Sequence, residues 1–390
     1  MPTIQKHWLM LAVLFLARTT MALQFQTVAS TGPFLLDALE IDFAALGALI
    51  GLYMLPGVVI ALPGGLFGQR FGAKQVVLAG LVLMALGAAM MAVSSSFAAA
   101  AAGRLIAGTG AVLLNVMCTK MIADWFAGRE IVTAMALLVT SWPFGLAVGL
   151  VAFGPLAAAG GWRAVMHLSA FVSVASMLLI AFAYRDPPHA PAPSAARFRL
   201  ELTGREWLLV GVAAAIWGFY NVAYIVLISF VPELFTARGY ALVDASWIVS
   251  LIGWVLIPSI PLAGYVVERF GRPNLFMAGG FSTAALAALA LPFVASPLIA
   301  FGVIALAIGA PAGMIMALPA QALRPESRAV GMGLFFTCYY AALALLPGGA
   351  GLARDLSGSP AAPAVFAGAM MLLCLIGLCV FLVAKRTTTK

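Results

Sequence analysis

This sequence of 390 residues has few charged residues: only 9% are Asp, Glu, Lys or Arg, while 64% are hydrophobic. A soluble domain of this length needs far more polar surface, so the composition excludes a soluble globular protein and indicates a membrane protein. Apolar runs of about 20 residues, the length that crosses a bilayer as a helix, recur between short polar breaks. Residues 76–93 and 361–384 are apolar all round, which excludes a membrane β-barrel.

Cysteine, histidine and acidic residues are also scarce. No disulfide framework or metal-ligand spacing is visible in the sequence, because all four cysteines fall in predicted spans: Cys118, Cys338, Cys374 and Cys379. The three histidines are far apart, and the sequence has no His-x-x-x-His cluster or Gly-x-Ser-x-Gly elbow. We therefore expect no enzyme, no metal and no cofactor. All 13 acidic residues lie in loops or near predicted span ends, so the sequence has no evident carboxylate at mid-membrane for a proton relay.

The net charge of +8 is spread along the chain rather than gathered in a basic module, which argues against nucleic acid as a partner. By the positive-inside rule the more basic breaks are cytoplasmic. They are the N-terminus, the even-numbered breaks and the C-terminus, and they carry Lys6, Arg70, Lys74, Arg129, Arg185, Arg197, Arg199, Arg205, Arg269, Arg272, Arg324, Arg328, Lys385, Arg386 and Lys390. We expect a multi-pass protein of the bacterial inner membrane with both termini in the cytoplasm.

The chain repeats itself. The segment 65–72, GLFGQRFG, recurs at 264–271 as GYVVERFG, and Pro33 maps onto Pro232 at the same offset. A segment rich in proline and charge separates the two copies. These features predict a six-helix half at 1–184, a cytoplasmic linker at 185–204 and a second six-helix half at 205–390. The twelve expected spans are 7–35, 43–67, 75–95, 98–124, 130–153, 162–184, 205–235, 245–267, 273–294, 297–320, 328–350 and 361–384.

Residues 65–74 resemble the signature of the major facilitator superfamily, Gly-x-x-x-Asp-Arg-x-Gly-Arg-Lys, and residues 104–110, RLIAGTG, resemble that family's fourth-span motif. The resemblance implies an all-α membrane fold of two pseudo-symmetric six-helix bundles that works by alternating access around a central cavity. Spans 1, 4, 7 and 10 would line most of that cavity. It also implies gating roles at the cytoplasmic breaks for Gly65, Gln69, Arg70 and Gly72 and for their counterparts Gly264, Glu268, Arg269 and Gly271.

The sequence departs from the family pattern at two places. Gln69 stands where the family has Asp, which puts the charge relay of the first half in doubt, although Glu268 supplies a carboxylate in the second. The fifth span lacks the Gly-Pro-x-x-Gly-Gly pattern of drug–proton antiporters. Within the superfamily, Trp125-Phe126 and an expected turn from Gly154-Pro155 to Gly161-Trp162-Arg163 are similar to the cyanate and nitroimidazole carriers.

Arg18 is the most informative single residue. It lies about eleven residues into the first predicted span, hence roughly 16 Å deep. A guanidinium at that depth costs about 2.5–3.5 kcal/mol by insertion scales, so it should face the interior of the bundle or a watery cavity. We favour the role of an anion-binding group for Arg18, and the alternative is a structural donor to helix carbonyls or a polar lock between helices.

Adding the repeat offset maps Arg18 onto Trp217, and the two positions should lie at similar depth on opposite sides of the cavity. Residues 217, 220, 221 and 224 then share one face of the seventh span. We expect this face to line the cavity, although aromatic stripes also serve helix packing. The full set of predicted substrate-binding residues is Arg18, Phe25, Gln26, Arg104, Asn115, Trp142, Trp217, Tyr220, Asn221, Tyr224 and Tyr340. For Arg104 a second anion station and a helix-packing role are equally open.

These observations predict a secondary transporter that takes up or exchanges a small organic or inorganic anion, such as a carboxylate, as symporter or antiporter. A proton or a counter-anion could couple transport, and we expect a monomer in contact with membrane lipid. The alternative is proton-coupled efflux of amphipathic drugs or metabolites. A receptor is disfavoured because the chain shows only a short central loop and tail.

Overall fold

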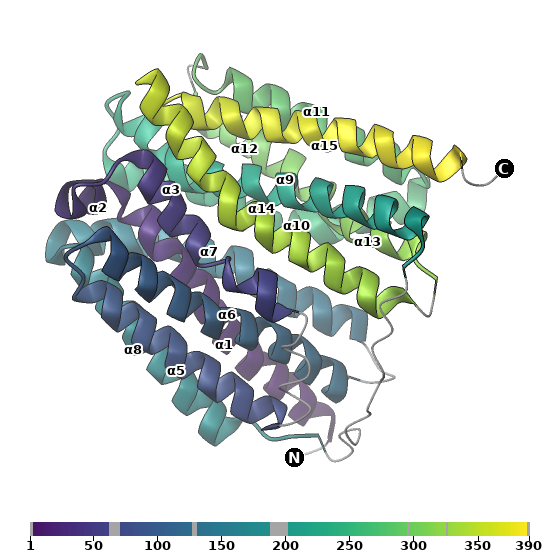
Figure 1. The fold of residues 1–390 in the computed structure, drawn as a ribbon, viewed down its shortest axis with the longest axis horizontal. Helices are drawn as coiled ribbons and strands as arrows, with labels where there is room; N and C mark the ends of the chain where they lie inside the picture. The colour runs from purple at the N-terminus through teal and green to yellow at the C-terminus, as the bar shows by residue number, and fades with distance from the viewer. Residues whose placement is uncertain are drawn as a thin grey trace. The chain divides into compact units, whose positions relative to one another are not determined.

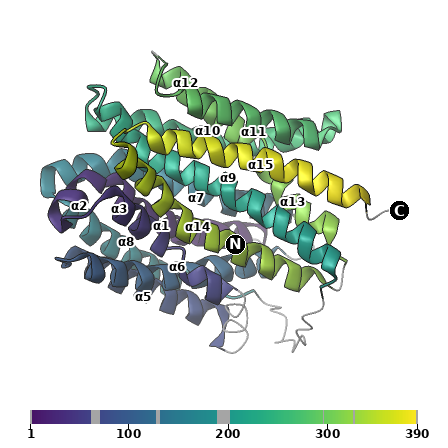
Figure 2. The ribbon, with the colours of Figure 1, turned by 45° about the horizontal axis from the view of Figure 1, so that its top comes forward.

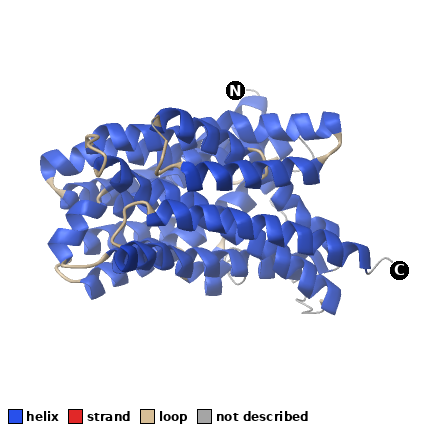
Figure 3. Cartoon of the chain, turned by 90° about the horizontal axis from the view of Figure 1, so that it is seen from above, coloured by secondary structure: helices blue, strands red, loops and turns tan. Residues whose placement is uncertain are grey.

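The computed structural model describes residues 3–61, 71–126, 131–187, 202–294, 296–324 and 327–387. Within these ranges the chain is helical with short connections and no strand (Figure 3). Twelve helices in the described residues are long and apolar enough to cross a membrane, which confirms the expected number of spans. The helices are α1 (Thr3–Ser30), α2 (Gly32–Leu39), α3 (Phe43–Leu52), α5 (Ala73–Ala92), α6 (Phe97–Trp125), α7 (Ile131–Gly160), α8 (Trp162–Ala183), α9 (Gly204–Thr236), α10 (Leu242–Phe270), α11 (Pro273–Ala290), α12 (Pro297–Gly309), α13 (Ala312–Ala322), α14 (Arg328–Ser357) and α15 (Ala362–Thr387).

Helices form here because a backbone in hydrocarbon must satisfy its own hydrogen bonds, and their apolar side chains can face either lipid or protein.

The chain divides into two units. Unit 1 contains residues 1–41 and 52–196, and unit 2 contains residues 42–51 and 197–390. The division therefore differs from the predicted halves at residues 42–51, the start of the second span.

Unit 1 is a bundle of α1 and α5–α8. α5 packs along both α6 and α8, and α1 packs along α7 and α8 (Figure 1). Its closest helix approaches are made through glycine. A Cβ on Gly80 would lie 2.7 Å from the carbonyl oxygen of Gly110, and a Cβ on Gly103 would lie 2.8 Å from the carbonyl oxygen of Gly87. Small residues at such crossings let helices approach closely within a membrane.

Unit 2 is organised around α9, which is the most buried of the twelve spans. α14 and α15 pack along α9, and α11 packs along α15 (Figures 1 and 2). α9 begins with a capping box in which Thr203 and Glu206 bond each other's backbone N–H groups. The seventh span is thus the central helix of its unit.

Residues 42–51 pack in unit 2 through a glycine contact between α3 and α14. A Cβ on Gly47 would meet the carbonyl oxygen of Pro347, and one on Gly51 would meet that of Ala344. The Asp355 carboxylate accepts from the backbone N–H groups of Phe43 at 3.1 Å and of Ala44 at 2.8 Å, so it caps the start of α3. After Leu52 the span is interrupted by a turn at residues 53–55 and continues as helix over residues 56–61.

The predicted end of the fifth span was wrong. The fifth span does not end at residue 153, because α7 runs through Pro155 to Gly160 and the turn falls at Gly161, where φ is +78°. A membrane helix tolerates proline where neighbouring groups satisfy the backbone that it frees. The tenth span has the predicted bounds within one residue, at Pro297–Pro319, but it is broken inside, since α12 ends at Gly309 and α13 begins at Ala312. Pro311 at this break has no N–H to continue the ladder.

Candidate substrate-binding site

Arg18 lies at the middle of the first span, twelve residues from each end of the apolar stretch Lys6–Ser30, or about 18 Å along the axis. Its side chain is half-buried. Nε donates to Asn115 Oδ1 at 2.9 Å, and Nη1 donates to Ser141 Oγ at 2.8 Å and to the carbonyl of Leu138 at 2.8 Å. A longer bond of 3.4 Å reaches the carbonyl of Val139.

These four acceptors come from α6 and α7, so Arg18 joins the first span to the fourth and fifth. All four are neutral oxygen atoms, and they fix the position of the guanidinium. The structural role predicted for Arg18 is present, because its guanidinium donates to helix carbonyls and joins three helices. The anion-binding role stays a prediction. Asn115, predicted independently as a site residue, is one of the groups that hold it.

The predicted neighbours of Arg18 on α1 are more deeply buried than Arg18 itself. Phe25 is 1% exposed and its ring lies 5.4 Å from that of the half-buried Trp142 and 5.8 Å from that of Tyr53. Gln26 is fully buried, its Nε2 donates to Ser30 Oγ at 3.1 Å, and its Oε1 has no hydrogen-bond partner. In this structure Phe25 and Gln26 are packing residues of unit 1, and Trp142 is the more accessible member of the group.

Arg104 is 1% exposed. Its Nη1 donates to the carbonyl of Gln24 at 3.1 Å and its Nη2 to that of Phe25 at 3.4 Å, while the guanidinium carbon lies 4.4 Å from the Tyr53 ring centroid. Carbonyl oxygens and an aromatic face are the partners that a buried cation needs in a low-dielectric interior. Of the two roles considered for Arg104, the structure favours helix packing over a second anion station.

The predicted stripe on α9 forms an aromatic cluster with α14. Trp217 stacks on Tyr220, with ring centroids 5.3 Å apart and an interplanar angle of 13°, and Tyr339 lies 6.0 Å from Trp217. Tyr340 packs 5.0 Å from Tyr339 and is 3% exposed. Trp217 and Tyr339 are half-buried, so these two rings are the accessible part of the cluster.

The polar atoms of the stripe have different surroundings. Asn221 Nδ2 donates to the carbonyl of Trp217 at 2.8 Å, one helical turn earlier. The Tyr220 hydroxyl donates to the carbonyl of Ile308 at 2.8 Å, beside the break between α12 and α13. The hydroxyl of Tyr224 is buried and has no hydrogen-bond partner. Tyr220 thus supplies a donor where the broken helix has lost its own.

The predicted gating residues are only partly visible. Gly65, Gln69 and Arg70 lie outside the described residues, as does the side chain of Glu268. Gly72 precedes α5 at φ +85° and Gly271 follows α10 at φ +67°, so both copies of the motif end on a glycine in the left-handed region. Gly264 lies inside α10 with open space where a Cβ would project, and Arg269 is exposed, its Nη1 being 3.4 Å from the Tyr265 hydroxyl. The gating role of these residues stays a prediction.

Two ion-pair clusters of unit 2 were missed by sequence reasoning. Glu206 is 2% exposed and accepts from Arg324 Nε and Nη2 at 3.1 Å each, from Ser327 Oγ, and from the N–H of Thr203 at 2.8 Å. Glu233 accepts from Arg354 Nη2 at 2.7 Å, and the Arg354 guanidinium carbon lies 4.7 Å from the centroid of the Phe43 ring. The capping pattern of Thr203 and Glu206 was a readable signal, whereas the partners lie more than a hundred residues away in the chain.

Comparison with known proteins places this arrangement in a family. The chain is 21% identical over 253 residues to the hexuronate transporter of Bacillus subtilis (strain 168), a match that covers 62% of this chain and 60% of that protein. It is 23% identical over 333 residues to the uncharacterised transporter YycB of the same organism, covering 83% of this chain and 80% of that one. The match to the hexuronate transporter thus spans about three fifths of that relative's length.

Among solved structures, the fold is similar to the inward-open conformation of the xylose transporter XylE from E. coli. The TM-score is 0.77 at 13% sequence identity, and the match covers 97% of this chain and 96% of that one. At this level of identity the likeness bears on the fold alone. The family model described as Major Facilitator Superfamily matches residues 14–347 and again 207–390. With twelve spans, a repeated motif and this match, the chain belongs to the major facilitator superfamily.

Proposed function

We propose that this transporter carries a small organic anion with a carboxylate group, by uptake or exchange, and that Arg18 binds the negative group. The observation that carries the proposal is a half-buried guanidinium at the middle of the first span, held by acceptors that are neutral. A positioned guanidinium favours a planar carboxylate, with which it can form two parallel hydrogen bonds.

The relative named for hexuronate supports an organic acid over an inorganic anion, since a hexuronate is a sugar that carries a carboxylate. Within unit 2, the half-buried rings of Trp217 and Tyr339 are suited to contact a ring-shaped group of a ligand, because aromatic side chains bury large apolar area and a tyrosine adds a hydroxyl. We propose these two residues as substrate contacts that are separate from the charge-binding role of Arg18.

The test varies the charge of the ligand at constant shape. Purified protein is reconstituted in liposomes, and uptake of a radiolabelled hexuronate is competed by the same hexuronate, by the neutral hexose and by a lipophilic cationic dye. We expect competition by the hexuronate and at least tenfold weaker competition by the hexose, since the loss of a charged partner costs at least about 1.4 kcal/mol. Equal competition by the hexose would refute a role for charge. Transport of the dye without transport of the hexuronate would favour drug efflux instead.

A thermal-unfolding screen gives a second readout that needs no transport direction. A ligand that binds the folded protein raises its apparent stability in proportion to RT ln(1 + [L]/Kd). A shift with hexuronates and other hydroxylated carboxylates, but not with neutral sugars, is the expected pattern. A shift with inorganic anions of every kind would point to a general anion site and would reject the organic substrate class.

A further inference from the structure

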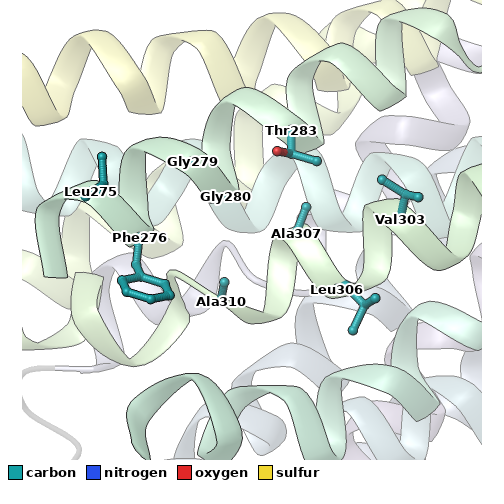
Figure 4. A pocket seen from close by; sticks show the side chains of 9 residues that line it. All are labelled: Leu275, Phe276, Gly279, Gly280, Thr283, Val303, Leu306, Ala307 and Ala310. Carbon is teal, nitrogen blue, oxygen red and sulfur yellow. The ribbon is translucent and has the colours of Figure 1, made fainter. Parts of the chain in front are cut away.

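The surface of unit 2 has an apolar groove between α11 and α12, with a volume of about 480 Å³ (Figure 4). Leu275 and Phe276 lie at one end of the groove, and Val303 and Thr283 at the other (Figure 4). Gly279 and Gly280 line the groove and contribute no side chain to it. Both helices that form it belong to membrane spans.

The walls of the groove are apolar side chains that the protein leaves uncovered. Leu275 is 62% exposed and Leu306 is 61% exposed, although each could pack in a protein core. In a membrane span such a surface is surrounded by hydrocarbon, where the only abundant partner is an acyl chain. The shape and chemistry of the groove therefore fit one lipid tail lying along α11.

Positive charge lies at one end of the groove. Arg272 is the N-cap of α11, and its carbonyl accepts from the N–H groups of Leu275 and Phe276, so it precedes the first groove residues by one helical turn. Arg272 and Arg269 are both exposed. The turn that carries them holds one glutamate, Glu268, so it has a net charge of +1. The distribution of positive residues predicts that this end faces the cytoplasm, on the side where anionic headgroups attract basic residues.

We propose that the groove between α11 and α12 is a binding site for an anionic phospholipid, whose headgroup phosphate pairs with Arg272 and whose acyl chain lies against Gly279 and Leu306. The site adjoins the break in the tenth span, since Ala307 and Ala310 are among its lining residues. It is independent of the proposed substrate and is tested without any transport measurement.

The experiment is a lipid titration of the full chain, followed by native mass spectrometry. Detergent-solubilised protein is titrated with phosphatidylglycerol and with phosphatidylcholine that carry the same acyl chains. We expect phosphatidylglycerol to bind about fivefold more tightly, because a basic residue near an anionic headgroup contributes about that factor. Arg272→Gln should remove this preference, whereas Arg386→Gln, an equal loss of charge at the end of α15, should leave it unchanged.

The tail is tested by filling the groove. A Cβ on Gly279 meets nothing within 4 Å, so Gly279→Leu can fold and occupies the acyl position. Gly279→Leu should weaken the binding of both lipids by tenfold or more. Gly211→Leu on α9, where a Cβ also meets nothing within 4 Å, should weaken the binding of neither. Val303→Trp on the opposite wall repeats the test if the first variant does not fold. Unchanged binding in the filled variants, or a preference lost equally in Arg386→Gln, overturns the proposal. A change of oligomeric state in Gly279→Leu would assign the groove to a second copy of the chain and also overturn it.

Discussion

Substitutions of Arg18 can distinguish the contribution of its charge to substrate binding from the contribution of its hydrogen bonds to the stability of unit 1. A hydrogen bond to a charged group contributes about 1.5–3 kcal/mol, so losing the carboxylate contact should weaken substrate binding by about 10- to 150-fold. Arg18→Gln removes the charge and is expected to fall in this range. Arg18→Lys keeps a point charge but loses the bidentate geometry, so its loss should be about tenfold.

The same substitutions also remove bonds within unit 1. Hydrogen bonds between membrane helices contribute about 0.6 kcal/mol on average, and Arg18 makes four of them to Asn115, Leu138, Val139 and Ser141. Arg18→Gln should therefore lower the free energy of unfolding by about 2 kcal/mol as well. Affinity must accordingly be measured on folded protein, by equilibrium binding of a radiolabelled hexuronate to material purified by size exclusion.

The matched control is Ser141→Ala. It removes the 2.8 Å bond from Arg18 Nη1 but keeps the guanidinium, so binding should change by no more than about threefold. Wild-type affinity and a wild-type uptake rate in Arg18→Gln would refute the anion-binding role. Equal losses in Arg18→Gln and Ser141→Ala would show that Arg18 acts only as a brace between helices.

Three further substitutions test the framework of unit 2, each by thermal unfolding with a thiol-reactive dye that reports exposure of buried cysteines. Glu206→Gln removes the negative charge and replaces one of two accepting oxygens with an NH2 donor that faces other donors, so it should cost about 1–3 kcal/mol, whereas Asp37→Asn on an exposed carboxylate should cost almost nothing. Gly51→Val should cost about 1–3 kcal/mol because its Cβ would overlap the backbone of α14, while Gly348→Ala, with 3.8 Å of clearance, should be tolerated. Tyr220→Phe removes one membrane hydrogen bond and should cost about 0.6–1.7 kcal/mol, with equal stability to wild type counting against its role at the helix break.

The sequence was sufficient for the membrane class, the number of spans and the position of Arg18 in the middle of the first span, because all three depend on the order of apolar and charged residues along the chain. The hydrogen-bond partners of Arg18 could not be predicted from the sequence. Asn115 and Ser141 lie 97 and 123 residues away, and only the packing of α6 and α7 against α1 brings them to the guanidinium. For the same reason the ion pairs of Glu206 and Glu233 could not be read in advance.

The effect of a proline on a single helix could not be predicted from the sequence either. Pro143, Pro155, Pro232 and Pro347 all lie inside continuous helices, whereas Pro311 lies at a break. The residue type is identical, so the outcome depends on whether neighbouring groups satisfy the freed carbonyls. That information belongs to the tertiary structure.

The bond from Tyr220 to the carbonyl of Ile308 decides what this hydroxyl can offer to anything that reaches it. Its single proton is already committed, so the oxygen can only receive a hydrogen bond. An incoming molecule would have to present an O–H or N–H to it, as a sugar hydroxyl does and a bare carboxylate or halide does not. The hydroxyl that hydrogen-bonds to the broken helix would thereby favour ligands that carry hydrogen-bond donors of their own.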